Sequence, residues 1–156
     1  MIQLIDCKLL DEVIVEARNS PRLRKNRNFH ASNDAPAQRL LNAIEPGSYV
    51  APHRHLAETK DETFVALRGR FGLVIFDDAG NITETQIIAA GSDVCGVNIP
   101  YGAWHSIVSL QPGSVFFEAK AGPYTQFTTE EKAPWAPVEN DPGATEYLAG
   151  LEKLLS

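Results

Sequence analysis

Three of the four histidines fall in a pattern that suits a metal ion. His53 and His55 are two positions apart. Because side chains alternate faces along a strand, both imidazoles would point the same way, with Cα atoms about 6.5–7 Å apart. Glu62 follows after a six-residue loop, and His105 follows a Pro-x-Gly turn. A single histidine is most often an ordinary core or surface residue, but the agreement of several spacings favours one cation bound by all four side chains.

This donor set would leave coordination positions free. Three neutral imidazoles and one carboxylate suit iron, manganese, nickel, cobalt, copper or zinc, so we expect one divalent transition metal of open identity.

By strand alternation, Tyr49 and Phe64 share the ligands' face and would line an apolar pocket. Tyr101 and Trp104 are close to His105 in the sequence. They either stack on a planar or sugar-like ligand or belong to the rim or the core.

The last predicted strand carries two charged residues, Glu118 and Lys120, on one face. A buried carboxylate is costly unless it is paired or takes part in chemistry. Glu118 therefore either pairs with an arginine of residues 22–27, the interpretation that we favour, or acts as a general base near the metal. Further candidates for the pocket lining are Lys120, His30 and the predicted strand residues Arg39 and Asn42.

Residues 18–27 hold five basic side chains and no acid. They could form a solvated face, pair with carboxylates elsewhere, or gather anionic ligands at the mouth of the pocket, since arginine grips carboxylate and phosphate in a bidentate manner. We favour simple charge pairing for this segment.

The whole composition excludes several classes of protein. The chain has 156 residues, 44% of them hydrophobic, which is ordinary for one globular domain. With 14 Lys+Arg against 20 Asp+Glu, the net charge of −6 argues against nucleic acid or an anionic membrane as the main partner. Two cysteines far apart, no signal-type apolar start and no membrane-length run lead us to expect a cytoplasmic protein with buried or incidental thiols.

Short apolar runs separated by glycine, proline and aspartate dominate the middle of the chain. The first helix is expected from a cap at Asp6 to Ser20, and a closing helix has one apolar face from Ala144 to Leu155. A hairpin turn is expected at residues 77–81, where Gly80 and Asn81 tolerate positive φ. Eight short strands without intervening helices predict a β-sandwich or barrel, at residues 38–44, 48–55, 62–68, 71–76, 82–88, 94–99, 104–109 and 114–120.

The spacing of these residues resembles two known motifs. The stretch from Gly47 through His53, His55 and Glu62 to Gly69 is similar to the first motif of the cupin superfamily, and Pro100-x-Gly102-x2-His105 is similar to the core of the second. Within that superfamily the chain resembles the WbuC family, on residues 24–30 and from Pro36 through His55. The gap between His55 and Glu62 is longer than usual, so Glu58 is a rival ligand. Glu62 is preferred because its spacing to Gly69 fits.

The resemblance implies an all-β fold, the cupin-type double-stranded β-helix or jelly-roll barrel with short flanking helices. It also implies one metal bound by His53, His55, Glu62 and His105. We expect a single domain over 1–156, with an N-terminal helix and basic arm (1–37), a barrel (38–122) and a C-terminal extension with a helix (123–156). A homodimer through sheet edges and terminal helices is also implied.

Three functional hypotheses follow. The first is a metal-dependent enzyme, isomerase- or epimerase-like or an oxygenase with Fe(II), which acts on an oxygen-rich or anionic small molecule such as a sugar derivative. The association of WbuC-like proteins with surface-polysaccharide gene clusters favours a sugar ligand. The second is a metal-containing binding or sensing module without catalysis, and the third is a purely structural metal.

Overall fold

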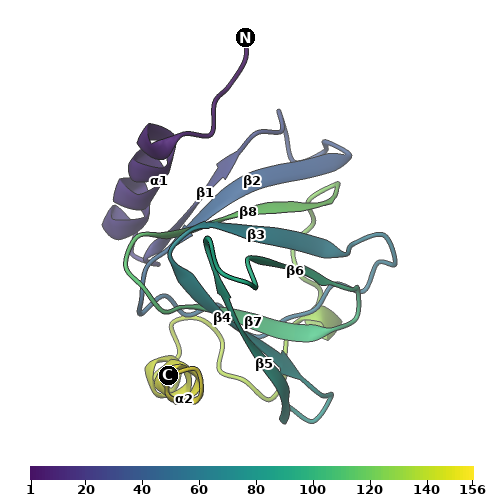
Figure 1. Ribbon diagram of the computed structural model, residues 1–156. Coiled ribbons are helices and arrows are strands. Elements are labelled where there is room, and N and C mark those ends of the chain that lie inside the picture. Colours follow the sequence, from purple (N-terminus) through teal and green to yellow (C-terminus); the bar gives the residue numbers. More distant parts are fainter.

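The computed structural model describes residues 1–156 as two facing antiparallel sheets flanked by two helices (Figure 1). The five-stranded sheet has the order β1-β2-β8-β3-β6. Its strands are β1 (Arg24–Asn28), β2 (Ala37–Ile44), β8 (Ser114–Ala121), β3 (Glu62–Arg68) and β6 (Gly96–Ile99). The three-stranded sheet has the order β5-β4-β7, formed by β5 (Ile82–Ala89), β4 (Arg70–Phe76) and β7 (Trp104–Ser109). The predicted jelly-roll fold with flanking helices is therefore confirmed.

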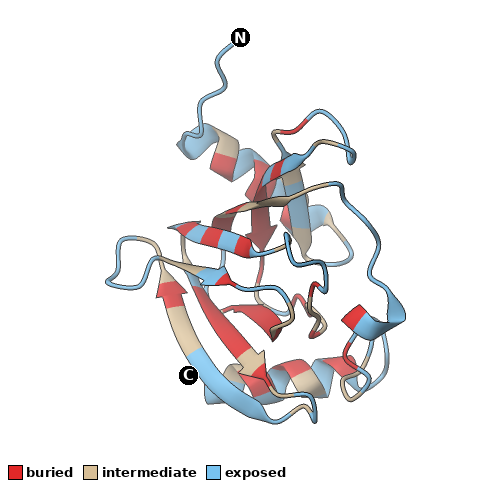
Figure 2. Ribbon diagram, turned by 90° about the vertical axis from the view of Figure 1, so that its right-hand side faces the viewer, coloured by how far each residue is buried: buried red, intermediate tan, exposed pale blue.

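The inner faces of the two sheets pack against each other. Along β3, Glu62, Phe64 and Ala66 are buried while the residues between them are exposed, as strand alternation requires. The cluster between the sheets takes its apolar side chains from seven strands: Ile44, Phe64, Ala66, Phe71, Leu73, Ile88, Ile99, Ile107 and Phe116. Figure 2 shows exposed residues at the N-terminal segment and buried ones along the strands and the packed helix faces.

Each helix covers the outer face of one sheet. The α1 helix (Cys7–Asn19) begins at Asp6, whose side chain accepts a hydrogen bond from the Leu9 amide at 2.9 Å. Its buried side chains pack on Leu41 and Ala43 of β2 and on Val115 of β8. The α2 helix (Ala144–Leu154) packs on the other sheet (Figure 1), through Ala144, Leu148 and Leu151 against Val74, Phe76, Trp104 and Val108. A third short helix, η1 (Thr129–Glu131), is of the 3-10 type.

Seven of the eight predicted strands exist within two residues of their expected ends. The eighth, 48–55, is wrong, because this segment forms only isolated bridges at His53, with His105 and with Lys132. The extra strand is β1, which lies in the basic segment and pairs with β2 from Arg24–Ile44 to Asn28–Leu40. Its charged and amide residues gave no apolar alternation from which to predict it.

The turns carry the backbone conformations that glycine permits. Residues 77–81 join β4 to β5 as expected, and Gly80 has φ +85°, whereas Asn81 does not need positive φ. Gly69, between β3 and β4, has φ +77°, and a Cβ there would lie 2.7 Å from the Ser114 Cα atom. This close approach explains the glycine that ends the first predicted motif.

Two further expectations concern the surroundings of the chain. Cys7 and Cys95 are free and exposed, so they are not the buried thiols that were one expectation. Neither α1 nor α2 has the length and the apolar composition that a bilayer crossing requires.

Candidate metal centre

The predicted ligand residues come from three separate segments that the sheets bring together. Glu62 is the first residue of β3, and His105 is the second residue of β7. His53 lies on an irregular segment, but it forms a bridge to β7 in which the amides of His53 and His105 each donate to the carbonyl of the other, at 3.0 and 2.9 Å. This bridge places the two imidazole rings with centroids 4.4 Å apart.

Three of these residues form a group that could hold a metal ion. Potential ligand atoms of His53, His55 and Glu62 all lie within 4.8 Å of one another. His105 reaches the same group through Glu62, since its Nε2 atom is 2.9 Å from Glu62 Oε2. The Nε2 atom of His55 is also 2.9 Å from Glu62, at Oε1. Glu58 lies exposed in the loop before β3 and is not part of the group.

Backbone contacts orient two of the imidazoles. Nδ1 of His53 lies 3.0 Å from the carbonyl oxygen of Ala51, and Nδ1 of His105 lies 2.9 Å from that of Ala103. A carbonyl oxygen only accepts, so each Nδ1 atom must carry the proton. In the neutral ring of His53 the Nε2 lone pair is then free, which is how metal-binding histidines are commonly oriented. Nε2 of His105 instead contacts Glu62 Oε2. Burial lowers the pKa of His53 to about 3, so this ring is neutral at physiological pH.

Glu62 lies at the centre of a chain of polar contacts. Burial alone would raise its pKa, but hydrogen bonds from His105 and His55 and the charge of Lys120 hold it well below its usual value. Lys120 Nζ is 3.1 Å from Glu62 Oε1 and 2.8 Å from Glu118 Oε1. Asn42 Nδ2 donates to the other Glu118 oxygen at 2.7 Å. Glu118 thus pairs with Lys120 and not with an arginine of residues 22–27, the pairing that we favoured.

These carboxylates face a cavity of about 590 Å³ between the sheets. Burial raises the pKa of Glu118, while the two carboxylates raise the pKa of Lys120 although its own burial opposes this. With Glu62 and Glu118 ionised and Lys120 charged, the polar cluster carries one net negative charge. A cation is the ion that such a buried cluster would attract.

The structure brings some of the predicted pocket residues to this cavity and not others. Phe64, Asn42, Lys120 and Glu118 line it. Tyr49 instead packs against α2, and its hydroxyl donates to the Pro137 carbonyl at 2.7 Å. The remaining predicted residues do not line it either: Tyr101, Trp104, Arg39 and His30.

Each of these departures has a local cause. Trp104 points outward from β7, because it alternates with His105, and its Nε1 atom donates to Asp78 at 3.0 Å. Tyr101 is exposed on the turn before β7. Arg39 is exposed on β2, and its backbone amide is 3.1 Å from Nδ1 of His30. His30 lines a smaller adjoining space.

Two aromatic residues that the sequence did not single out lie at the cavity. Phe127 packs over the imidazoles, with its ring centroid 4.7 Å from that of His53 and 5.4 Å from that of His55. Tyr124 lines the cavity from the same irregular segment. This segment has no periodicity that could have placed the two rings, and only their position shortly after the last strand was visible in the sequence.

The basic segment is largely paired, as we favoured. Arg22 and Arg24 both bind Glu139, with nitrogen–oxygen distances of 2.7 Å. The others pair with Glu45, Glu16 and Glu12: Arg18, Lys25 and Arg27. Because two guanidinium groups share one carboxylate, and because Arg22, Arg24 and Lys25 also line the cavity, one positive charge of the cavity lining is left uncompensated.

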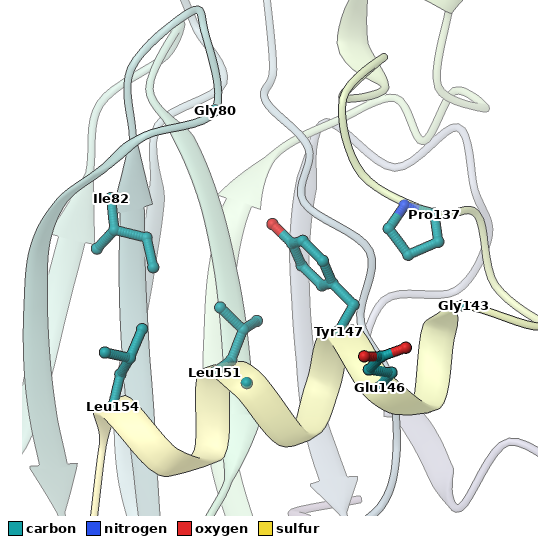
Figure 3. Close-up of a pocket in the computed structure, with 9 residues that line it drawn as sticks. Gly80, Ile82, Pro137, Gly143, Glu146, Tyr147, Leu151 and Leu154 are labelled. Carbon is teal, nitrogen blue, oxygen red and sulfur yellow. The ribbon is translucent and has the colours of Figure 1, made fainter.

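A second cavity of about 510 Å³ lies between α2 and the β4–β5 hairpin (Figure 3). Figure 3 shows Leu151, Leu154 and Tyr147 of the helix and Ile82 of the hairpin around it. Glu146 is its one ionisable acid, and it contains no histidine or cysteine. The space between the sheets, which holds the converging ligand atoms, is therefore the better candidate for chemistry.

Solved structures of other proteins share this fold. The chain is similar to KdgF from Halomonas sp., with a TM-score of 0.51 and 18% identity over 68% of this chain and 84% of that one. It is also similar to oxalate decarboxylase from Lactobacillus farciminis, with a TM-score of 0.50 and 20% identity over 65% of this chain and 29% of that one. The shared fold and the His/Glu group define a cupin-fold protein with a possible metal site.

The chain belongs to the family described as Domain of unknown function (DUF6016), whose profile matches residues 5–88. That match includes His53, His55 and Glu62 and ends before His105. The chain is also 38% identical over 88 residues to the tryptophan synthase beta chain of Xanthomonas euvesicatoria pv. vesicatoria (strain 85-10). This likeness covers 56% of the chain but only 21% of that enzyme, most of which has no counterpart here.

Proposed function

We propose that this protein binds one divalent transition metal through His53, His55, Glu62 and His105, and that it acts on an oxygen-rich or anionic small molecule such as a sugar derivative. The observation that carries the proposal is the convergence of oriented imidazoles and a buried carboxylate on one cavity. The chemistry of the donor set, nitrogen and carboxylate oxygen without thiolate, fits such ions.

Charge and size support this class of ligand. The polar cluster of Glu62, Glu118 and Lys120 carries one net negative charge, so a bound divalent ion would turn it to one net positive charge. The uncompensated arginine charge of the cavity lining adds to the attraction for an anion. A volume of about 590 Å³ lies within the usual range for small-molecule sites, about 300–1,000 Å³.

When bound, the ion would supply Lewis acidity toward a substrate oxygen, or redox chemistry if it were iron. The chain's own residues have separate tasks. Glu118 is the candidate general base, since its carboxylate lines the cavity next to the ligand group, and burial raises its pKa. Lys120 would hold Glu118 and Glu62 in place and stabilise negative charge on the substrate.

Metal analysis tests the first half of this proposal. Protein purified without chelator should contain close to one equivalent of a transition metal by elemental analysis, and His53→Ala or His105→Ala should remove it. Full occupancy in either variant would contradict the ligand assignment. Glu58→Gln is the matched control, because this carboxylate is exposed and outside the group.

A non-catalytic binding or sensing module is the second candidate. It is favoured by the contacts of Glu118, whose two oxygens already lie 2.8 Å from Lys120 and 2.7 Å from Asn42. Turnover of candidate sugars by the metal-loaded protein separates the two. If the protein is an enzyme, Glu118→Gln should abolish turnover and retain metal. If no sugar or sugar acid is turned over while binding is retained, the module is favoured.

We further propose that the protein is cytoplasmic, consists of one cupin domain of the WbuC type and assembles as a homodimer. Its proposed role is in surface-polysaccharide biosynthesis. Exposed unpaired cysteines support the location, and the partly exposed apolar side chains of Val65 and Leu67 on the outer face of β3 support assembly. Light scattering coupled to size-exclusion chromatography would test the dimer.

A further inference from the structure

A smaller compartment of about 220 Å³ adjoins the metal cavity. The two spaces share four lining residues, among them Asn26, Glu118 and Lys120, so a ligand can extend from one into the other. Both spaces lie along β1, because Arg24 and Asn26 line the larger one and Asn26 and Asn28 line the smaller one. At about 30 Å³ per water molecule, the compartment has room for about seven waters, or for one small ring.

The lining of this compartment is rich in uncharged groups that both donate and accept. Asn26 and Asn28 alternate along β1 and pair in register with Asn42 and Leu40 of β2. Their side-chain amides make no hydrogen bond within the chain. Gln38 is different, because its amide is fixed by donation to the carbonyls of residues 33 and 35 at 3.2 and 2.9 Å. Asn33 also lines the space, and its side-chain amide makes no hydrogen bond within the chain, so three free amides remain for a ligand.

His30 adds a buried imidazole nitrogen to the compartment. The side chain is only 8% exposed. Its Nδ1 atom lies 3.1 Å from both the backbone nitrogen and the carbonyl oxygen of Arg39, so it either accepts from the amide or donates to the carbonyl. Nε2 then donates in the first tautomer and accepts in the second, and it makes no hydrogen bond within the chain. A ligand hydroxyl, which both donates and accepts, would satisfy Nε2 in either tautomer.

Charge selects against an anion in this space. Lys120 is the one cation that lines it, and its ammonium group is already within 3.1 Å of two carboxylates. A phosphate or carboxylate placed here would face Glu118 without a free cation. Hydroxyl groups, which both donate and accept, instead match amide groups that do the same.

We propose that this amide-lined compartment is a second subsite, which holds a neutral polyhydroxylated ring, a single sugar residue, of the ligand whose other part lies in the metal cavity. The proposal rests on the proposed function for the ligand as a whole, but the subsite itself does not require the metal. The anionic part of such a ligand would lie toward Arg22 and Arg24, at the opposite end of β1.

The test is saturation-transfer NMR on the full chain with defined probes. The neutral probes are glucose, galactose, mannose and N-acetylglucosamine, and the anionic probes are glucuronate and glucose 6-phosphate. We expect at least one neutral sugar to bind. Binding should persist after chelation and in His105→Ala, so that loss of the metal and loss of the subsite are distinguishable. If no neutral probe binds, or if only anionic probes bind, the proposal is overturned.

Matched variants locate the binding. The double substitution Asn26→Leu and Asn28→Leu should weaken the affinity for the neutral sugar about tenfold or more, because it removes two of the three free amides. Asn98→Leu, at the exposed position of β6, is the control and should leave the affinity unchanged. Equal affinity in the double variant would overturn the proposal. Independently of the variants, the side-chain amide resonances of Asn26 and Asn28 in the wild-type chain should shift on titration with sugar, and unshifted resonances would also overturn it.

Discussion

Metal-dependent stabilisation gives the sharpest test of the ligand group. A ligand that binds only the folded chain stabilises it by RT ln(1 + [L]/Kd), which is about 2.7 kcal/mol at a metal concentration of one hundred times Kd. For a chain of this length, 1 kcal/mol shifts the unfolding midpoint by about 2–4 °C. Metal added to chelator-treated wild-type protein should therefore raise Tm by about 5–11 °C.

Removal of one imidazole should abolish most of this rise. Changes even to groups behind the ligands cost about 10–100-fold in metal affinity, so loss of His53 itself should cost about 100-fold or more. At the same metal concentration the stabilisation then falls to about 0.4 kcal/mol, and the Tm rise falls to about 1–2 °C.

The assay is differential scanning calorimetry of wild-type protein, His53→Ala and Glu62→Gln, each with and without Mn²⁺, Ni²⁺ or Zn²⁺. Two controls match them: His30→Gln removes the histidine outside the ligand group, and Glu58→Gln removes the exposed carboxylate. Both should keep the full metal response. A full metal response in His53→Ala, or loss of the metal response in Glu58→Gln, would refute the ligand assignment.

Three further predictions concern the fold. Gly69→Ala should lower Tm by about 2–8 °C in thermal unfolding, because positive φ costs a side chain about 1–2 kcal/mol and the Cβ also meets Ser114; an unchanged Tm would contradict the close approach. Asp6→Ala should cost about 1 kcal/mol through loss of the α1 cap, measured by urea unfolding, and Asp6→Asn should restore most of it. Burial raises the pKa of Glu139, but the hydrogen bonds and charges of Arg22 and Arg24 outweigh this and lower it. Its contribution to stability is therefore present above the unfolded pKa, about 4.3, and is lost as pH falls below that value. Glu139→Gln should flatten the acid side of the Tm–pH curve, and an unaltered curve would count against the pairing.

The sequence predicted the strands well where one face is buried. In β3, the alternation of apolar residues located both the element and the inward face on which Glu62 lies. β7 is buried on both faces, and the sequence located it only as a short apolar run. The argument for His53 and His55 used a strand that does not exist. Their rings nevertheless approach, with centroids 5.6 Å apart, because the bridge to β7 fixes the backbone at His53.

Contacts between distant segments were beyond the reach of sequence patterns. An arginine was favoured as the partner of Glu118, although Lys120 lies two residues away on the same strand face. The contact of Lys120 with Glu62 could not be foreseen in this way, because it depends on the pairing of β3 with β8, in which Glu62 lies opposite Lys120. Phe127 and Tyr124 arrive at the cavity from an irregular segment whose path depends on tertiary hydrogen bonds, such as that from the Tyr124 amide to the Asn33 carbonyl at 2.7 Å. No local periodicity encodes such a path.

Phe127 has a consequence for the kinetics of the site. Its ring covers two imidazoles from a segment without regular secondary structure, which Lys60 tethers through the Pro123 carbonyl at 2.9 Å. Local opening of such a segment, residues 122–128, requires far less free energy than global unfolding. The rate at which a chelator removes the metal would then report the local opening of residues 122–128. Substitutions of Lys60 should change this rate and leave the equilibrium affinity for the metal intact.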